Sequence, residues 1–258
     1  MSEFVKKALE GRVHVPIEQQ QVELNLEFLP NGEVVNNTGQ DPAIPVIRGH
    51  RNYWVAADLG QANDFTAVAV IEDEALPIID DGELLLGPRR RTVVYADRFR
   101  GVSYVDVCDH LIRLTNAPPF GGKSELVIDG TSLGRVVSDI LWDQNIPHHA
   151  VQMTGGQSWK KESARYVNAG KTFMIENTAV LFASGDLKFA EDLPLRKEIE
   201  SDLASFSLTT TAAGNQIITQ SRNAGGHGDL GISLIVGAFA SQYLRPQKIQ
   251  VHRLRGWS

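Results

Sequence analysis

The sequence predicts a mixed α/β protein in which one sheet is flanked by helices and carries an accessory β-hairpin. Three apolar runs of strand length come first, at residues 53–58, 66–72 and 92–100. Helical and strand patterns then alternate, and a long Gly- and Ala-rich helix over residues 229–243 ends the series. In this order the first and fourth strands can lie side by side, which would make the ends of those strands neighbours.

The elements between the third strand and the last helix follow from periodicity, caps and turn residues. Ser103 is placed to cap the first helix, and Ala213-Gly214-Asn215 is placed to turn a hairpin. The predicted elements are a helix over 103–115, a strand over 125–129, a helix over 132–144, a strand over 148–153, helical structure in two pieces over 162–183, a helix over 194–206 and a hairpin over 207–220.

The two ends of the chain differ from this central part. Residues 1–51 are rich in turn formers, including Pro30-Asn31-Gly32, and we expect an arm or linker with at most a short hairpin there. The ordered domain is predicted over residues 52–244. Residues 245–258 form a tail with four basic residues and no acid.

Composition sets outer limits on function. The chain has 258 residues, 42% of them hydrophobic and 22% charged, as in ordinary globular proteins. Its net charge of −6 gives no global field for nucleic acid, so DNA binding would need a local basic patch. A single cysteine, Cys108, excludes an internal disulfide and a cysteine zinc cage. We find no signal peptide or membrane span, and expect a cytoplasmic protein without membrane contact.

Three aspartates stand where apolar runs stop or begin. Asp58 and Asp129 end predicted strands, and Asp229 opens the last helix. Singly, each has an ordinary explanation as a turn or helix-start residue. Jointly, three carboxylates at one end of one sheet are ligands for a hard cation such as Mg²⁺ or Mn²⁺. Asp64, in the turn after Asp58, is a candidate fourth ligand.

These acids stand in motifs that resemble a known family. Asp58-Leu59-Gly60, followed by Asp64 and Thr66, and Val127-Ile128-Asp129-Gly130-Thr131 are similar to stretches of the large terminase subunit of tailed bacteriophages. The order continues with Thr154-Gly155-Gly156, Ser184-Gly185-Asp186 and His227-Gly228-Asp229. The resemblance runs from about residue 53 to 243 and covers only the nuclease half of that family. One departure is Gly228, where the family commonly has an aspartate.

The resemblance implies a ribonuclease H-like fold and a metal-dependent endonuclease that cuts double-stranded DNA during viral genome packaging. Asp58, Asp129 and Asp229 would be the catalytic, metal-binding acids, Asp64 an accessory ligand and His227 a partner beside the last acid. Two ions, Mg²⁺ or Mn²⁺, would perform the hydrolysis. Implied partners are a packaging ATPase, a small terminase subunit and a portal. Two alternatives stay open: a junction-resolvase-like nuclease of the same fold, and a non-catalytic packaging or assembly module.

Two basic segments bear on partners. Lys160, Lys161 and Arg165 follow the strand after Asp129, and we expect them to contact DNA. Ala117–Ser124, with Lys123, fits a relaxed phosphate-loop pattern. A helix precedes it and a strand follows, which is the reverse of what a phosphate loop requires, so a plain helix-to-strand loop is favoured.

Overall fold

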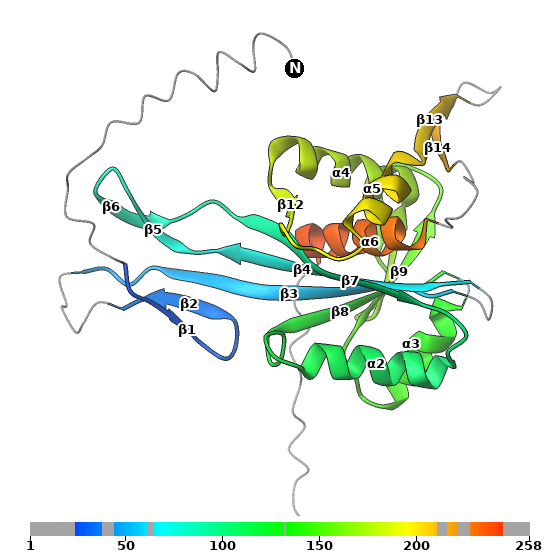
Figure 1. Cartoon of the computed structure of the whole chain (residues 1–258), viewed down its shortest axis with the longest axis horizontal. Coiled ribbons are helices and arrows are strands. Elements are labelled where there is room, and N and C mark those ends of the chain that lie inside the picture. Colours follow the sequence, from blue (N-terminus) through cyan, green and yellow to red (C-terminus); the bar gives the residue numbers. More distant parts are fainter. Residues whose placement is uncertain are drawn as a thin grey trace, which may run out of the picture.

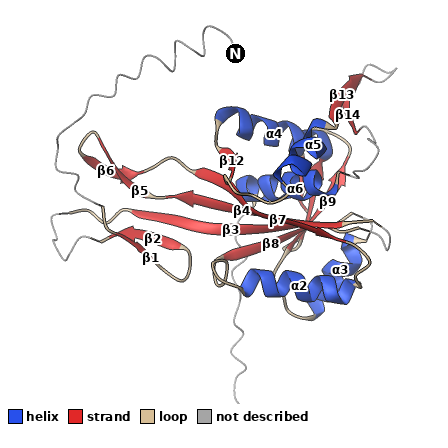
Figure 2. Ribbon diagram, viewed as in Figure 1, coloured by secondary structure: helices blue, strands red, loops and turns tan. Residues whose placement is uncertain are grey.

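The computed structural model describes residues 24–37, 44–60, 64–131, 133–210, 216–220 and 228–244. Over these ranges the chain forms a mixed sheet with helices on both faces (Figures 1 and 2). The α-helices are α2 (Tyr104–Asn116), α3 (Gly134–Asp143), α4 (Lys171–Ser184), α5 (Arg196–Ala204) and α6 (Asp229–Tyr243). None of the helices in these ranges is long and apolar enough to span a bilayer.

The sheet has ten strands in this part of the chain. They are β1 (Leu26–Phe28), β2 (Glu33–Asn36), β3 (Arg48–Asp58), β4 (Thr66–Ala75), β7 (Arg90–Phe99), β8 (Ser124–Asp129), β9 (His149–Thr154), β10 (Trp159–Lys161), β11 (Tyr166–Gly170) and β12 (Leu187–Phe189). The main order is β10-β11-β9-β8-β3-β4-β7-β12. Strands β3, β4 and β7 are antiparallel, whereas β8 pairs parallel to β3 and β9 parallel to β8. This is the mixed arrangement predicted for a ribonuclease H-like fold, and the neighbouring positions of the first and fourth predicted strands are confirmed.

Two small hairpins extend the long strands at the end of the sheet opposite the carboxyl end of β3 (Figure 1). One is β1–β2, turned at Asn31-Gly32 as expected and joined to the sheet by β2 pairing with β3. The other, β5 (Pro77–Asp80) with β6 (Glu83–Leu86), was not expected from the sequence. The predicted domain boundary near residue 52 therefore falls inside β3. A third hairpin, β13 (Phe206–Thr210) with β14 (Gln216–Gln220), is the predicted accessory hairpin before α6.

The helical prediction over 162–183 is wrong for its first half. Tyr166–Gly170 is strand β11, which pairs parallel to β9, and the helix begins only at Lys171. The segment is too short to show a strand period, and its pairing partner lies in another part of the chain. Tertiary pairing therefore decides its structure. The predicted capping of α2 is confirmed, since the Ser103 hydroxyl accepts a hydrogen bond from the Asp106 amide at 3.2 Å.

Side-chain alternation in the strands divides the core into two clusters, one on each face of the sheet. Helices α2 and α3 cover one face, and α4, α5 and α6 cover the other (Figure 2). In α6 every residue from Leu230 to Ser241 is buried. A Cβ at Gly237 would stand 2.9 Å from the Ala56 Cβ and 3.1 Å from Ile71, so glycine lets the helix lie directly on β3 and β4.

An ionic network fixes the other end of α6 to the sheet. The Arg89 guanidinium donates to both carboxylate oxygens of Asp73, at 2.7 and 2.5 Å, and to the Ser241 carbonyl oxygen. Arg91 donates to the Ser241 hydroxyl at 2.9 Å. Burial of Asp73 opposes its ionisation, but the bonds from Arg89 and His50 outweigh burial and lower its pKa from 3.8 to about 2. Asp73 is therefore an ionised, paired group that stabilises the fold.

Asp73→Asn should lower the free energy of unfolding at pH 7 by about 2–3 kcal/mol, because the paired charge is removed and Arg89 keeps no carboxylate. Since the folded pKa lies below the unfolded value, the contribution is present above about pH 4 and disappears as the pH falls towards 2. Urea unfolding of both proteins at pH 7 and at pH 3 measures the effect. The exposed Asp80→Asn is the matched control and should change stability little. An Asp73→Asn variant as stable as the parent would contradict this account.

Candidate functional site

The first two predicted acids lie at the same edge of the sheet. Ala57 of β3 pairs with Ile128 of β8, so Asp58 and Asp129 follow the last paired residues of two adjacent parallel strands, about 5 Å apart. Their neighbours two positions earlier, Ala56 and Val127, belong to the cluster under α6. Because side chains alternate along a strand, Asp58 and Asp129 both point to the α6 side.

The third predicted acid comes from α6 itself. Asp229 is the first residue of the helix, after Gly228 in the left-handed conformation with φ of 79°. The helix start is fixed from the side by Asp202 of α5, whose carboxylate accepts a hydrogen bond from the Gly231 amide at 3.2 Å. The packing of α6 on β3 thereby brings Asp229 to the same edge as Asp58, and the charges of the two residues interact.

The charges of the other two acids both act on Asp58. Burial raises the pKa of Asp58 well above its ordinary value, and the negative charges of Asp129 and Asp229 raise it further. Within the described ranges, no three carboxylate, imidazole or thiolate side chains stand close enough to hold a metal ion as they are. The donor set, all carboxylate oxygens, nevertheless fits a hard divalent cation. The charge of such an ion would offset the repulsion between the acids.

Asp129 is held by the loop that follows it. The Thr131 amide donates to its carboxylate at 2.8 Å, and the Met153 amide donates to the Thr131 hydroxyl at 3.1 Å. Burial raises the pKa of Asp129, while the bonds from Thr131 and the charge of Lys171 lower it in part. A Cβ at Gly134 would lie 1.7 Å from the Asp129 carbonyl oxygen, so only glycine lets α3 begin this close to the acid.

Lys171 is a member of the site that the sequence analysis missed. It is the first residue of α4, directly after β11, and its positive charge offsets part of the rise in the pKa of Asp58 and of Asp129. Its ammonium group lies 5.4 Å from the Phe206 ring centroid. A lysine in the first helical turn opposes the helix dipole. A lysine at this unfavourable helix position could have indicated a functional role. The sequence does not reveal that position, because the strand before Lys171 is predicted as helix.

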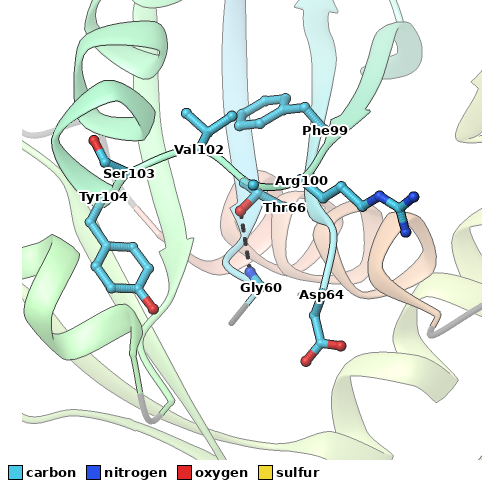
Figure 3. Close-up of a pocket in the computed structure, with 9 residues that line it drawn as sticks. Gly60, Asp64, Thr66, Phe99, Arg100, Val102, Ser103 and Tyr104 are labelled. Atoms are coloured by element: carbon cyan, nitrogen blue, oxygen red, sulfur yellow. Dashed lines mark hydrogen bonds between the residues drawn. The ribbon is translucent and has the colours of Figure 1, made fainter. Parts of the chain in front are cut away.

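Asp64, the predicted fourth ligand, lies in the turn between β3 and β4. It lines a cavity of about 240 Å³ between the turn after β3 and the start of α2, together with Thr66, Arg100 and Tyr104 (Figure 3). The Thr66 hydroxyl accepts a hydrogen bond from the Gly60 amide at 3.3 Å, which closes the turn. The charges that raise the pKa of Asp58 are those of Asp129 and Asp229. The role of Asp64 as a fourth ligand stays a prediction, and His227 lies outside the described residues.

The predicted basic strip divides into two parts. Lys160 and Lys161 are exposed on β10, and Lys160 lies 3.3 Å from Glu162. Arg165 is engaged: its guanidinium pairs with Asp139 at 3.1 Å, donates to the Ser138 carbonyl and lies over the rings of Trp142 and Tyr166. Strand β10 is separated from β8 by β11 and β9, which places the two lysines about 14 Å to the side of Asp129.

Lys123 occupies a loop between α2 and β8, as expected for a segment that is not a phosphate loop. Its ammonium group lies 5.7 Å from the centroid of the Tyr53 ring. The order helix, loop, strand leaves no helix N-terminus to bind a phosphate there.

The fold and site thus define an α/β protein with an acidic group at the carboxyl edge of a mixed sheet. Among solved structures, the large terminase nuclease of thermophilic phage G20c with bound magnesium matches with a TM-score of 0.48 and 22% identity, over 84% of this chain and 90% of that chain. A form of it with bound cobalt matches equally. The large terminase nuclease domain of Thermus phage P74-26 matches with a TM-score of 0.49 and 22% identity, over 77% and 84%.

No protein-family model and no curated protein matches the chain. The matching structures are of the kind that the sequence motifs resemble. The chemistry of this chain has to be inferred from the residues of its own site.

Asp58→Asn should raise the thermal midpoint at pH 7–8 by a few degrees, because it removes a buried charge that two neighbouring acids repel. The raised folded pKa means that the native state binds this proton more tightly than the unfolded chain. The penalty of ionised Asp58 is therefore absent below about pH 4 and grows as the pH rises through the folded pKa. Calorimetric scans of both proteins between pH 4 and 8 should show the difference shrinking towards pH 4. A difference independent of pH would contradict the charge assignment.

Proposed function

We propose that this protein is a divalent-metal-dependent endonuclease that cuts double-stranded DNA during viral genome packaging. The observation that supports the proposal is that Asp58 and Asp129 end adjacent strands at one edge of the sheet, and that the charges of Asp129 and Asp229 both act on Asp58. Three repelling, partly buried carboxylates are costly to a fold unless they have a role as ligands. Phosphodiester hydrolysis is the chemistry in which such a set of oxygen ligands is used.

Asp58 and Asp129 would hold the ions from the strand side, and Asp229 from the start of α6. The ions, Mg²⁺ or Mn²⁺ and two in number, would supply an activated water and stabilise the leaving oxygen. Asp64, at the end of the neighbouring turn, is proposed as an accessory ligand and His227 as a partner of Asp229.

The residues around the acids orient the carboxylates and reduce their negative field. The hydrogen bonds from Thr131 fix the orientation of the Asp129 carboxylate. The charge of Lys171 offsets part of the negative field that would otherwise repel a phosphate. The anchoring of α6 by Asp202 keeps Asp229 at the edge of the sheet.

DNA would approach from the side of β10, where Lys160 and Lys161 are exposed. We propose these two lysines as phosphate contacts. Arg165, the third predicted contact, holds α3 to the start of β11 and would support the strip from behind. With a net charge of −6 the chain would bind duplex weakly, which fits delivery of the DNA by a packaging ATPase, a small terminase subunit and a portal in the cytoplasm of the bacterial host.

Plasmid digestion tests the proposed activity. Supercoiled DNA should be nicked and linearised with Mg²⁺ or Mn²⁺ and left intact with a chelator. Asp58→Asn and Asp129→Asn should each reduce cleavage at least 100-fold, since removing one ligand carboxylate disrupts the site. Asp80→Asn, at an exposed position in the β5–β6 hairpin, is the control and should cut normally. Undiminished cleavage by both site variants would refute the mechanism.

Preferential cutting of four-way junctions would favour the resolvase alternative, and absence of Mn²⁺ binding would favour a non-catalytic module.

Lys160→Ala/Lys161→Ala should bind duplex more weakly and cut more slowly at low salt, with Mn²⁺ affinity unchanged. Removing two phosphate-binding charges should reduce the slope of log affinity against log salt by roughly two units. Fluorescence anisotropy over a salt series measures the slope, and calorimetric titration with Mn²⁺ measures the metal affinity. An unchanged slope would show that DNA follows another path.

A further inference from the structure

Two arginines share one aromatic ring at the carboxyl end of β7. The guanidinium carbons of Arg98 and Arg100 lie 5.0 and 5.3 Å from the centroid of the Phe65 ring, which stands at the entry to β4. An arginine held on an aromatic face loses less side-chain entropy when it binds an anion, because its planar fork is already oriented. The Phe65 ring therefore holds the two guanidinium groups close together, and we call Phe65, Arg98 and Arg100 the arginine unit.

The strand register puts this unit in line with the acids. Ala67 of β4 pairs with Asp58 on one side and with Arg98 on the other. Ala67 and Ala96 both belong to the core cluster under α6, so Arg98, two positions after Ala96, faces the α6 side as Asp58 does. The charge of Arg98 accordingly lowers in part the pKa of Asp202, on α5 above that face. Two strand spacings separate Arg98 from Asp58, about 10 Å.

Neither arginine forms an ion pair with a carboxylate within the described ranges, whereas Arg89 and Arg165 each form one. Arg98 is partly exposed and Arg100 exposed. In Figure 3 the Arg100 side chain extends to the same side of the cavity as Asp64 and away from Ser103 and Tyr104. The positive charge is therefore available to a ligand.

The acids consequently have cations on both sides. Lys171 stands at the end of β11, on the β8 side of the group, and Arg98 and Arg100 stand at the end of β7. Five strand spacings separate β11 from β7 in the sheet, about 24 Å. A phosphate backbone bound along this edge would pass Lys171 first, then the acids, and then Arg98 and Arg100.

We propose that Arg98 and Arg100, oriented by Phe65, grip the phosphate backbone of the bound DNA strand on the β7 side of the acids. The strand then runs along the carboxyl edge of the sheet, from Lys171 across Asp129 and Asp58 to the end of β7. The inference rests on the proposed nuclease function and adds a direction for the substrate. The two arginines are positioning residues, since they hold phosphates beside the one that reacts.

The test is the binding of duplex DNA by the full chain in Ca²⁺. Fluorescence anisotropy measures this binding over a salt series. Arg98→Gln/Arg100→Gln should reduce the salt slope by about two units, one for each phosphate that is no longer neutralised. Arg113→Gln/Lys188→Gln removes the same charge from exposed residues in the last turn of α2 and in β12, and should leave the slope unchanged. Phe65→Leu keeps both charges but removes the ring, so it should keep the slope and weaken affinity several-fold.

Several outcomes would overturn the proposal: an unchanged slope in the double arginine variant, or equal reductions in that variant and the control pair. Arg100→Gln alone, at an exposed position, should reduce the slope by about one unit and guards against misfolding of the double variant. In Mn²⁺ the Arg100→Gln protein should show a raised KM with kcat within about twofold of the parent, because a positioning contact acts mainly on binding. A parent protein that binds with the expected slopes but never cuts would refute the nuclease function and leave the grip standing.

Discussion

The close packing of α6 against β3 and β4 is the contact on which the arrangement of the site depends. The helix is buried along nearly its whole length and crosses the sheet with Gly237 against Ala56. At its start it carries Asp229 to the edge where β3 and β8 end, and near its other end the Arg89 and Arg91 side chains hold Ser241. A shift of one helical turn, about 5.4 Å, would separate Asp229 from Asp58 and break up the acidic group.

The two ends of α6 use charge in opposite ways. At the Ser241 end, Asp73 is matched by Arg89, and its pKa is lowered because the ionised form is the stable one. At the Asp229 end, three acids share one edge, and the pKa of Asp58 is raised because burial and like charges oppose ionisation. The ion pair at the Ser241 end stabilises the fold. The acids at the Asp229 end repel one another, and a bound cation or a lysine can reduce this repulsion. Perturbed acids of the second kind are characteristic of functional sites.

The sequence allowed the central part of both fold and site to be predicted, because both are encoded locally. Asp58 and Asp129 end strands whose apolar runs are unmistakable, and the order of elements makes β3 and β8 neighbours. Strand β11 was missed because Tyr166–Gly170 gains its structure from pairing with β9, a contact that no local pattern records. Lys171 was missed with it. The stacked arginines were invisible for the same reason, since Phe65 meets Arg98 and Arg100 only through the pairing of β4 with β7.

Two glycines help to place the acids of the site, because each allows a close backbone contact that a side chain would prevent. Asp129 keeps its place because position 134 has no Cβ to strike its carbonyl oxygen, and Asp229 keeps its place because position 237 has none to strike Ala56. Neither glycine would touch a substrate, an ion or an acid side chain. The arrangement of the carboxylates is thus specified partly by missing atoms. A search for related sites that compares only charged residues would therefore overlook these two glycine positions.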